Sequence, residues 1–267
     1  MRVLQVELYI INILIKMYHP KQICFLTLIL LSCFAHSQKN KDLNIIYIGN
    51  SITQGALLED PELNSPPAQS TKILIDGNVF KSVSFSNQGV SGSTSVDFLP
   101  LTNTLFTKVK EAANRFYQDK NAILLFSIML GTNDSASNGA NGAPVSSRQY
   151  STNLKAIIDE LIYLYPKALF VIHKPLWYSP NTYNYAMYLE AGQKRLQSYF
   201  PEIENLVELY AQRRPNQVYL GDKDASDYLE ANYEDLFIAE KGNAGIFYLH
   251  PNKAGAQVLA NFWSRAF

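Results

Sequence analysis

Short apolar runs that favour β-strands alternate with amphipathic helical segments along most of this chain, and this alternation limits the fold more than any other feature. Strands that read as continuous apolar runs are typical of a sheet that is buried on both faces. Strands separated by helices pair in parallel, so the pattern predicts an α/β fold with a central parallel sheet. Five runs are expected to form its strands: residues 45–48, 83–85, 123–129, 169–172 and 218–220.

Two of the covering helices show a clear apolar stripe at helical spacing. One is expected over residues 147–165, where Pro166 ends it, and the last begins near Asn252, a favourable N-cap residue. The chain carries no internal repeat and no long Pro/Gly linker between residues 38 and 267. We therefore predict a single domain over residues 38–267.

The N-terminal segment differs in composition from the rest of the chain. Lys21 precedes an apolar run over residues 23–34, and small residues follow just before Gln38. This arrangement predicts a secretory signal peptide over residues 1–37, and hence an exported protein, periplasmic or extracellular. The alternative is a membrane-spanning anchor, but the run is shorter than the roughly 20 residues that span a membrane. No membrane span is expected after the signal is removed. A signal does not need the apolar patch further upstream, which makes Met17 an alternative start.

Both cysteines of the chain, Cys24 and Cys33, fall inside this segment. A chain that is cleaved before Gln38 therefore has neither a free thiol nor a disulfide. The residues that end at Cys33 also resemble a bacterial lipoprotein cleavage box. A lipidated Cys33 at the mature N-terminus is thus the alternative to a freely exported protein.

Charge and residue composition exclude several classes of partner. The formal net charge is zero and the Lys and Arg residues are scattered, so neither nucleic acid nor an anionic membrane surface is an expected partner. After cleavage the chain keeps two histidines and no cysteine, with no spacing typical of metal ligands, so we expect no metal and no cofactor. Nothing in the sequence indicates an oligomeric state.

Ser51 follows the first expected strand, in the turn Gly49-Asn50-Ser51. In open α/β sheets, ligands bind in the crevice outside the carboxyl ends of the strands, and this position delivers a hydroxyl there. Ser51 is therefore a candidate nucleophile. The alternative is that the segment is a plain turn whose serine caps the next helix.

A serine nucleophile needs a base within hydrogen-bond reach, and few histidines are available. His19 and His36 lie in the segment that is removed. His250 precedes the last helix, where a loop can present its imidazole to the crevice. His173 follows the fourth strand, and we expect it to be a packed, hydrogen-bonded structural residue.

Acyl transfer also needs hydrogen-bond donors for the oxyanion, and two further strand ends offer them. Gly92 follows the second strand in Gly89-Val90-Ser91-Gly92, where the lack of a side chain lets its backbone N–H approach a ligand. Asn133 follows the third strand, and a side-chain amide is a common oxyanion donor.

Together these segments resemble the four sequence blocks of the SGNH hydrolases, the GDSL-type esterases. Residues 49–53, 89–92, 131–134 and 250–252 are similar to the blocks that carry Ser, Gly, Asn and His, in the family's order. The resemblance implies a flavodoxin-like three-layer α/β/α sandwich with Ser51 as nucleophile and oxyanion N–H, Gly92 and Asn133 as the other oxyanion donors, and His250 as base. The Gly-x-Ser-x-Gly motif of the other large esterase class does not occur.

Two positions depart from the family pattern. Asn50 stands where the commonest motif has Asp, and we expect this change to be tolerated because the residue supports the turn. Phe247 stands three residues before the histidine, where the family has the acid of its triad. Three hypotheses remain open: a Ser-His dyad held by a backbone carbonyl, a relocated acid for which Asp235 and Glu240 are nearest in sequence, or a relative that has lost activity.

The resemblance also suggests a substrate class. The loops over residues 59–70 and 135–146 are polar and follow strands, so they are expected to border the crevice. An exported single-domain protein with such a polar crevice rim is more similar to carbohydrate O-acetyl esterases than to lipases, so we expect hydrolysis of acetyl esters on glycans or sialic acids. Trp177 and Tyr178, which follow the fourth strand, are expected to stack on a sugar ring. The alternatives are a catalytically impaired carbohydrate-binding protein, and a thioesterase or lysophospholipase, which would need an apolar groove.

Overall fold

The computed structural model describes residues 41–267. The predicted signal peptide over residues 1–37, the alternative start at Met17 and the alternative lipid attachment at Cys33 lie outside the described residues. Within residues 41–267, no helix is both long enough and apolar enough to cross a membrane.

Five parallel strands form the central sheet, in the order β2-β1-β3-β4-β5. They lie over the apolar runs of the sequence, and β1 and β2 extend beyond these runs at both ends. The predicted α/β fold with a parallel sheet is therefore confirmed. The strands are β1 (Asp42–Gly49), β2 (Ser82–Gly89), β3 (Ile123–Met129), β4 (Leu169–Ile172) and β5 (Val218–Leu220).

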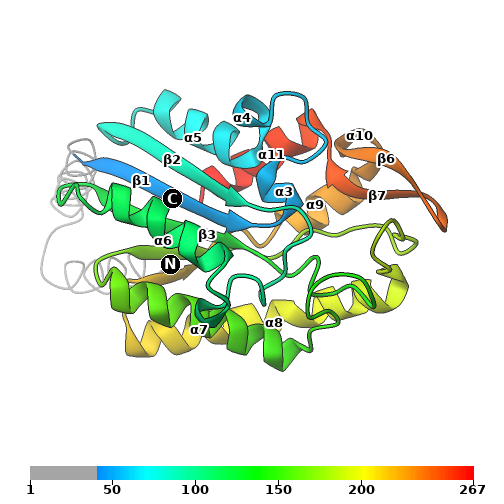
Figure 1. The fold of residues 1–267 in the computed structure, drawn as a ribbon. Helices are drawn as coiled ribbons and strands as arrows, with labels where there is room; N and C mark the ends of the chain where they lie inside the picture. Colours follow the sequence, from blue (N-terminus) through cyan, green and yellow to red (C-terminus); the bar gives the residue numbers. More distant parts are fainter. Residues whose placement is uncertain (1–40) are drawn as a thin grey trace, which may run out of the picture.

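Helices cover both faces of this sheet, which confirms the three-layer α/β/α sandwich (Figure 1). The described helices are α3 (Ser51–Gln54), α4 (Pro61–Asn64), α5 (Pro66–Asp76), the short 3-10 helix η1 (Pro100–Thr102), α6 (Leu105–Phe116), α7 (Ser147–Leu164), α8 (Leu189–Arg213), α9 (Ala225–Ala231), α10 (Tyr233–Leu236) and α11 (Lys253–Ser264). Successive strand residues point to opposite faces. Ile46 and Ile48 of β1 accordingly pack in the apolar cluster with α6, α7 and α8, whereas Ile45 and Tyr47 pack with α5 and α11.

The carboxyl ends of β1, β2 and β3 lie at the same level of the sheet. Gly49 of β1 is in register with Gly89 of β2 and with Met129 of β3. From β1 the chain passes to β2 on one side and then crosses to β3 on the other, so β1 marks a topological switch point. Ligands bind outside the strand ends at such points. The loops that follow these strands therefore converge on one crevice.

An antiparallel hairpin of β6 (Phe237–Gly242) and β7 (Gly245–Pro251) precedes the last helix. The sequence indicated a loop around His250, but this residue lies in β7. The helix α11 then begins at the predicted cap, because the side chain of Asn252 accepts the N–H of Gly255 at 3.0 Å. The hairpin is the main element that the sequence patterns did not predict.

His173 is a structural residue, as expected, and is fully buried beyond the end of β4. Its Nδ1 accepts the backbone N–H of Asp222 at 3.0 Å, so the ring proton is on Nε2. That nitrogen therefore donates to Oγ of Ser127 at 3.0 Å. The imidazole links β3 to the loop after β5, and its ring stacks on Trp263.

Because His173 is buried, we expect the unfolding free energy of the protein to fall in acid. Burial lowers the pKa of His173 from 6.5 to about 3, so the folded protein keeps the ring neutral while the unfolded chain protonates it. The stabilisation is complete above pH 6.5 and is lost progressively as the pH falls toward 3. At 1.36 kcal/mol per pH unit, this group lowers the unfolding free energy by about 2 kcal/mol between pH 6.5 and pH 5.

Urea unfolding of the protein and of His173→Gln at these two pH values measures that contribution. Glutamine keeps one donor and one acceptor but does not titrate, so the variant is expected to lose about 2 kcal/mol less on acidification. Equal losses in both proteins would show that His173 does not control this part of the pH dependence.

Candidate active site

Ser51 is the first residue of α3 and lies directly beyond the end of β1. The helix is capped by Asn50, whose Oδ1 accepts the backbone N–H of Ile52 at 3.0 Å. The cap is thus Asn50 and not Ser51, so the Ser51 hydroxyl is available for another partner. Capping needs only a side-chain oxygen, a requirement that Asn meets as well as Asp does.

Two glycines allow the tight turn that carries Ser51. A Cβ at Gly49 would lie 2.0 Å from Oγ1 of Thr53, and a Cβ at Gly89 would lie 2.3 Å from the backbone N of Gln54. Any side chain at either position would push α3 away from the ends of β1 and β2. The glycines of the first two blocks therefore set how closely the nucleophile candidate approaches the sheet.

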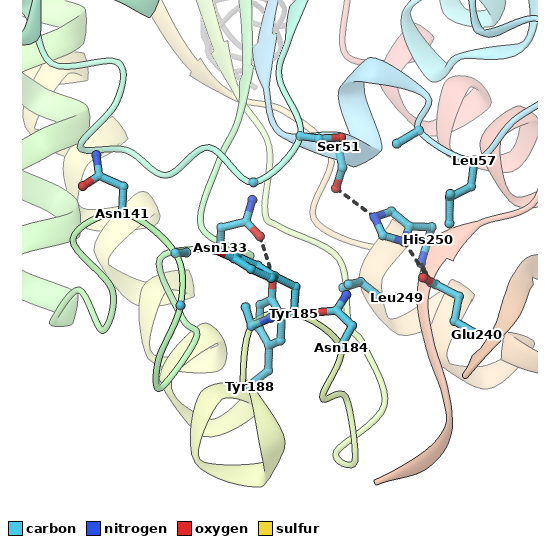
Figure 2. Close-up of a pocket in the computed structure, with 16 residues that line it drawn as sticks. Ser51, Leu57, Asn133, Asn141, Asn184, Tyr185, Tyr188, Glu240, Leu249 and His250 are labelled. Atoms are coloured by element: carbon cyan, nitrogen blue, oxygen red, sulfur yellow. Dashed lines mark hydrogen bonds and ion pairs between the residues drawn. The ribbon is translucent and has the colours of Figure 1, made fainter. Parts of the chain in front are cut away.

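The imidazole of His250 lies between Ser51 and Glu240 (Figure 2). Its Nε2 is 2.9 Å from Oγ of Ser51, and its Nδ1 is 2.8 Å from Oε1 of Glu240. The same carboxylate oxygen accepts the backbone N–H of His250 at 3.2 Å, which holds Glu240 against β7. Ser51 and His250 are 199 positions apart in the sequence, yet together with Glu240 they form one continuous hydrogen-bonded chain.

The partner of Nδ1 decides which nitrogen of His250 can act as a base. An ionised carboxylate only accepts hydrogen bonds, so the Nδ1 that faces Glu240 carries the proton and Nε2 presents its lone pair to the Ser51 hydroxyl. In the second Ser-His pair of the described chain, Ser127 and His173, a backbone N–H occupies Nδ1 and the tautomer is the opposite one. Only the His250 pair is arranged for proton abstraction from serine.

Glu240 lies one strand away from the position where the family motif places its acid. In the β6–β7 ladder, Glu240 pairs directly with Phe247, the residue three positions before the histidine. Phe247 itself is buried in the apolar core. Asp235, the other candidate acid, is exposed on α10, and its backbone oxygen accepts from the side chain of Asn252. Of the two candidates, the structure brings only Glu240 to His250.

Three hydrogen-bond donors border the same cavity as Ser51. Within residues 41–267, no protein acceptor binds the backbone N–H of Ser51 or of Gly92. Gly92 has a φ of +78°, a conformation that side chains rarely adopt, and a Cβ there would meet no atom within 4 Å. The third donor is Asn133, which uses one hydrogen of its Nδ2 to bind the carbonyl of Ser93 at 2.8 Å and has the other left.

Tyr188 fixes the orientation of the Asn133 amide. Its hydroxyl donates to Oδ1 of Asn133 at 2.6 Å, which places the NH₂ group on the other side (Figure 2). Burial, together with the charge of Glu240, raises the pKa of Tyr188 well above its ordinary value, so the hydroxyl keeps its proton. The sequence motifs gave no signal for this residue, because it contacts Asn133 from a loop 55 positions further along the chain.

Asp134 anchors the loop that carries Asn133. Its buried carboxylate accepts the backbone N–H of Ser95 and the Ser95 hydroxyl. Burial raises the pKa of Asp134 to about 6. These bonds tie the loop after β3 to the loop after β2, and so set the distance between Asn133 and Gly92, two of the candidate oxyanion donors.

An open cavity of about 410 Å³ lies beside these groups. Ser51, Gly92, Asn133, Glu240 and His250 all line it, so the structure gathers the main residues that the sequence indicated. Three further lining residues, Gly139, Ala140 and Asn141, come from the loop over residues 135–146 that was expected to border the crevice. The other expected loop, residues 59–70, forms α4 and the start of α5 and does not line the cavity. Outside the four sequence blocks, the sequence assigned no role to the remaining lining residues, which are Ala56, Leu57, Asn184, Tyr185, Ala186, Tyr188 and Leu249.

Trp177 and Tyr178 do not line this cavity, which corrects the prediction that they stack on a sugar. Trp177 is 8% exposed and packs against Tyr233 and Phe237, and Tyr178 is fully buried. The Tyr178 hydroxyl bonds instead to that of Ser135. The segment after β4 passes into the core beneath the β6–β7 hairpin, where it offers no ring to a ligand.

Solved structures of similar fold include three bacterial proteins. A GDSL-like lipase from Parabacteroides merdae has a TM-score of 0.57 at 18% identity, covering 85% of this chain and 96% of its own. A carbohydrate acetylesterase from Sinorhizobium meliloti has a TM-score of 0.56 at 15% identity, covering 84% and 97%. A catalytic mutant of an acetylxylan esterase from Geobacillus stearothermophilus has a TM-score of 0.57 at 16% identity, covering 85% and 94%. At these identities the likeness shows the fold alone.

A sequence comparison identifies the family. No curated protein sequence matches the chain significantly. The family model of the GDSL-like Lipase/Acylhydrolase family, however, matches residues 47–258, a range that holds Ser51, Gly92, Asn133 and His250. Because this match covers well over half of the sequence, the chain belongs to the GDSL-like lipase/acylhydrolase family.

Proposed function

We propose that this protein is an exported serine esterase that hydrolyses small acyl esters, above all O-acetyl groups on carbohydrates. The observation that carries the proposal is the hydrogen-bonded chain Ser51–His250–Glu240 at the edge of a cavity that three donors border, each with an N–H that no acceptor of residues 41–267 binds. Residues 1–37 provide the signal for export in this proposal. The reaction needs no cofactor, since nucleophile, base and oxyanion donors are all side chains or backbone groups.

In the proposed mechanism, Oγ of Ser51 attacks the acetyl carbonyl while Nε2 of His250 takes the hydroxyl proton. The negative charge that develops on the carbonyl oxygen is bound by the N–H groups of Ser51 and Gly92 and by Nδ2 of Asn133. The imidazolium, stabilised by Glu240, then returns the proton to the leaving alcohol. Water attacks the acetyl-serine with the same base, which releases acetate and restores Ser51.

The cavity supports a small acyl group and a polar alcohol. Its lining mixes the amides of Asn133, Asn141 and Asn184 with the apolar side chains of Ala56 and Leu57, and a long fatty acyl chain would need an extended apolar groove. The carbohydrate esterases among the solved structures of similar fold support the same substrate class. The lack of an acid at position 247 suggested a carbohydrate-binding relative without activity. The contact between Glu240 and Nδ1 of His250 argues against that alternative.

Acetate release by the purified protein tests this function. We expect hydrolysis of acetylated saccharides and of simple acetyl esters, with kcat/KM falling as the acyl chain lengthens from acetyl to octanoyl. A preference for long acyl chains or for acyl thioesters would point to a lysophospholipase or thioesterase. Tight saccharide binding without any acetate release would favour the inactive carbohydrate-binding alternative.

Tyr188→Phe is expected to lower kcat about tenfold and to leave KM nearly unchanged. Removal of a complete oxyanion donor costs about 10²–10³ in kcat, and loss of the group that orients Asn133 should cost part of that. Steady-state kinetics on an acetyl ester give both constants. Tyr199→Phe is the matched control, because this buried tyrosine donates to the carbonyl of Val145 instead. An unchanged kcat in Tyr188→Phe would contradict the orienting role.

A further inference from the structure

We propose that Tyr185 and Asn184 form a binding platform for a neutral sugar ring, and that the enzyme selects uncharged acetylated saccharides over acetylated sialic acids. This inference rests on the proposed esterase function and names the alcohol part of its substrate. It starts from the exposure of Tyr185, which lines the cavity although 92% of its surface is exposed. In Figure 2, Tyr185 and Asn184 lie on the side of the cavity opposite Ser51.

The position of Tyr185 suits the alcohol side of an ester bound at Ser51. The carbonyl oxygen of that ester has to face Gly92 and Asn133, so the sugar extends from Ser51 toward the opposite wall. An aromatic side chain offers a large flat apolar face with a polar tip. A pyranose ring has an apolar face of C–H groups that matches such a surface, whereas the hydroxyls around its edge need polar partners.

Asn184 supplies such a polar partner next to Tyr185. Its Oδ1 accepts the backbone N–H of Ala186 at 3.0 Å, which fixes the side chain. No group of the described chain bonds to its Nδ2, so this nitrogen has donors left for a sugar hydroxyl. Across the cavity, Asn141 uses its Nδ2 to bind Asp97 at 2.7 Å and keeps its Oδ1 as an acceptor.

The backbone around Tyr185 is held on two sides. Met187 forms antiparallel bridge bonds with Asn138, and the N–H of Asn243 in the β6–β7 turn donates to the carbonyl of Tyr183 at 2.7 Å. The neighbouring loop packs so closely that a Cβ at Gly139 would lie 2.9 Å from Cα of Ala186. The backbone that carries Tyr185 and Asn184 is therefore held before the sugar binds, which reduces the entropy cost of binding.

The charge of the cavity selects against anionic sugars. Among the described residues that line it, the only acidic or basic side chains are Glu240 and His250, and these two pair with each other. A sialic acid would bring its carboxylate into a site that offers no Lys or Arg partner and whose one acidic side chain is Glu240. A neutral acetylated hexose or pentose has no charge that needs such a partner.

The first test compares kcat/KM for glucose penta-acetate, 9-O-acetyl-N-acetylneuraminic acid and ethyl acetate. We expect the protein to prefer the glucose ester to the sialic acid ester at least tenfold. In Tyr185→Ala, the ratio of glucose ester to ethyl acetate should fall about tenfold, mainly through KM, and Tyr185→Phe should restore it. Tyr163→Ala, which removes a tyrosine that is 79% exposed on α7, is the matched control and should keep the ratio.

A second test separates this inference from the proposed function. In the Ser51→Ala background, calorimetric titration with glucose penta-acetate measures binding without turnover, and adding Tyr185→Ala should raise Kd about tenfold. An unchanged Kd, or equal kcat/KM for the neutral and the sialic acid ester, would overturn the platform even if the protein is an esterase. Absence of acetate release from all three esters would instead overturn the esterase function, while the binding result still tests the platform.

Discussion

Ser51→Ala is expected to abolish ester hydrolysis, with a loss in kcat on the order of 10⁶, as removal of the nucleophile causes in a serine protease. The reason is chemical, because alanine has no atom that can form the acyl-enzyme, and the imidazole of His250 then has no hydroxyl at 2.9 Å to deprotonate. Acetate release from an acetylated saccharide, followed by titration or by coupled assay, measures the loss. The thermal unfolding midpoint of the variant shows whether the fold is kept.

The second Ser-His pair of the molecule provides a matched control. Ser127→Ala also removes a hydroxyl that lies 3.0 Å from a histidine Nε2, but this pair is buried in the sheet and away from the cavity. This variant should keep kcat and lose about 1–3 kcal/mol of stability, because the N–H of His173 loses its acceptor. If Ser51→Ala retained activity, or if Ser127→Ala lost it while still folded, the assignment of the nucleophile would be wrong.

Glu240→Ala is expected to lower kcat by on the order of 10⁴, the loss seen when a triad acid no longer sets the histidine tautomer. Without the carboxylate, nothing holds the proton of His250 on Nδ1, and the imidazolium formed during attack has no counter-charge. Glu240→Gln keeps the shape of the side chain but removes the charge and replaces one oxygen with an NH₂ donor that can face Nδ1. Because the amide variant of a serine-protease acid loses about 10⁴ through the wrong tautomer, we expect a loss of the same order here.

Asp235→Asn is the control for Glu240. Asp235 is also close to His250 in sequence, but its side chain is exposed on α10 and does not bond to the imidazole. Its replacement should leave kcat unchanged. Wild-type kcat in both Glu240 variants would mean that the acid contributes nothing and that the enzyme works as a Ser-His dyad.

The architecture could be predicted from the sequence because it depends on local patterns. Strands buried on both faces must be apolar throughout, so the runs over residues 45–48 and 123–129 marked β1 and β3. Once the sheet is parallel, residues that follow successive strands meet at one edge. This is why Ser51, Gly92 and Asn133 could be placed together without a structure.

The remaining parts of the site depend on contacts between distant segments. Glu240 reaches His250 across an antiparallel hairpin, and the sequence between them was not recognised as a turn between two strands. The glycines Gly242 and Gly245, which flank the two-residue link Asn243-Ala244, are the signal that could have revealed this hairpin. Once the hairpin is known, Glu240 lies opposite Phe247, and it is the candidate for the acid that the motif lacks at position 247.

Aromatic residues were the least predictable from the sequence. Trp177 and Tyr185 both lie in segments rich in turn residues, yet the first is 8% exposed and the second 92%. Burial here depends on where the hairpin and the loop over residues 138–139 pack against these segments. No local pattern records such packing, so the choice between a packed ring and a binding surface needed the structure.

Covalent labelling with a fluorophosphonate tests most directly that Ser51, His250 and Glu240 work as one unit. Intact-mass measurement and peptide mapping should show one adduct per chain, on Ser51, with a labelling rate on the order of 10⁴ lower in Glu240→Ala. The claim that these three residues work as one unit would be contradicted by the absence of an adduct, by an adduct on another residue, or by an equal labelling rate in Glu240→Ala.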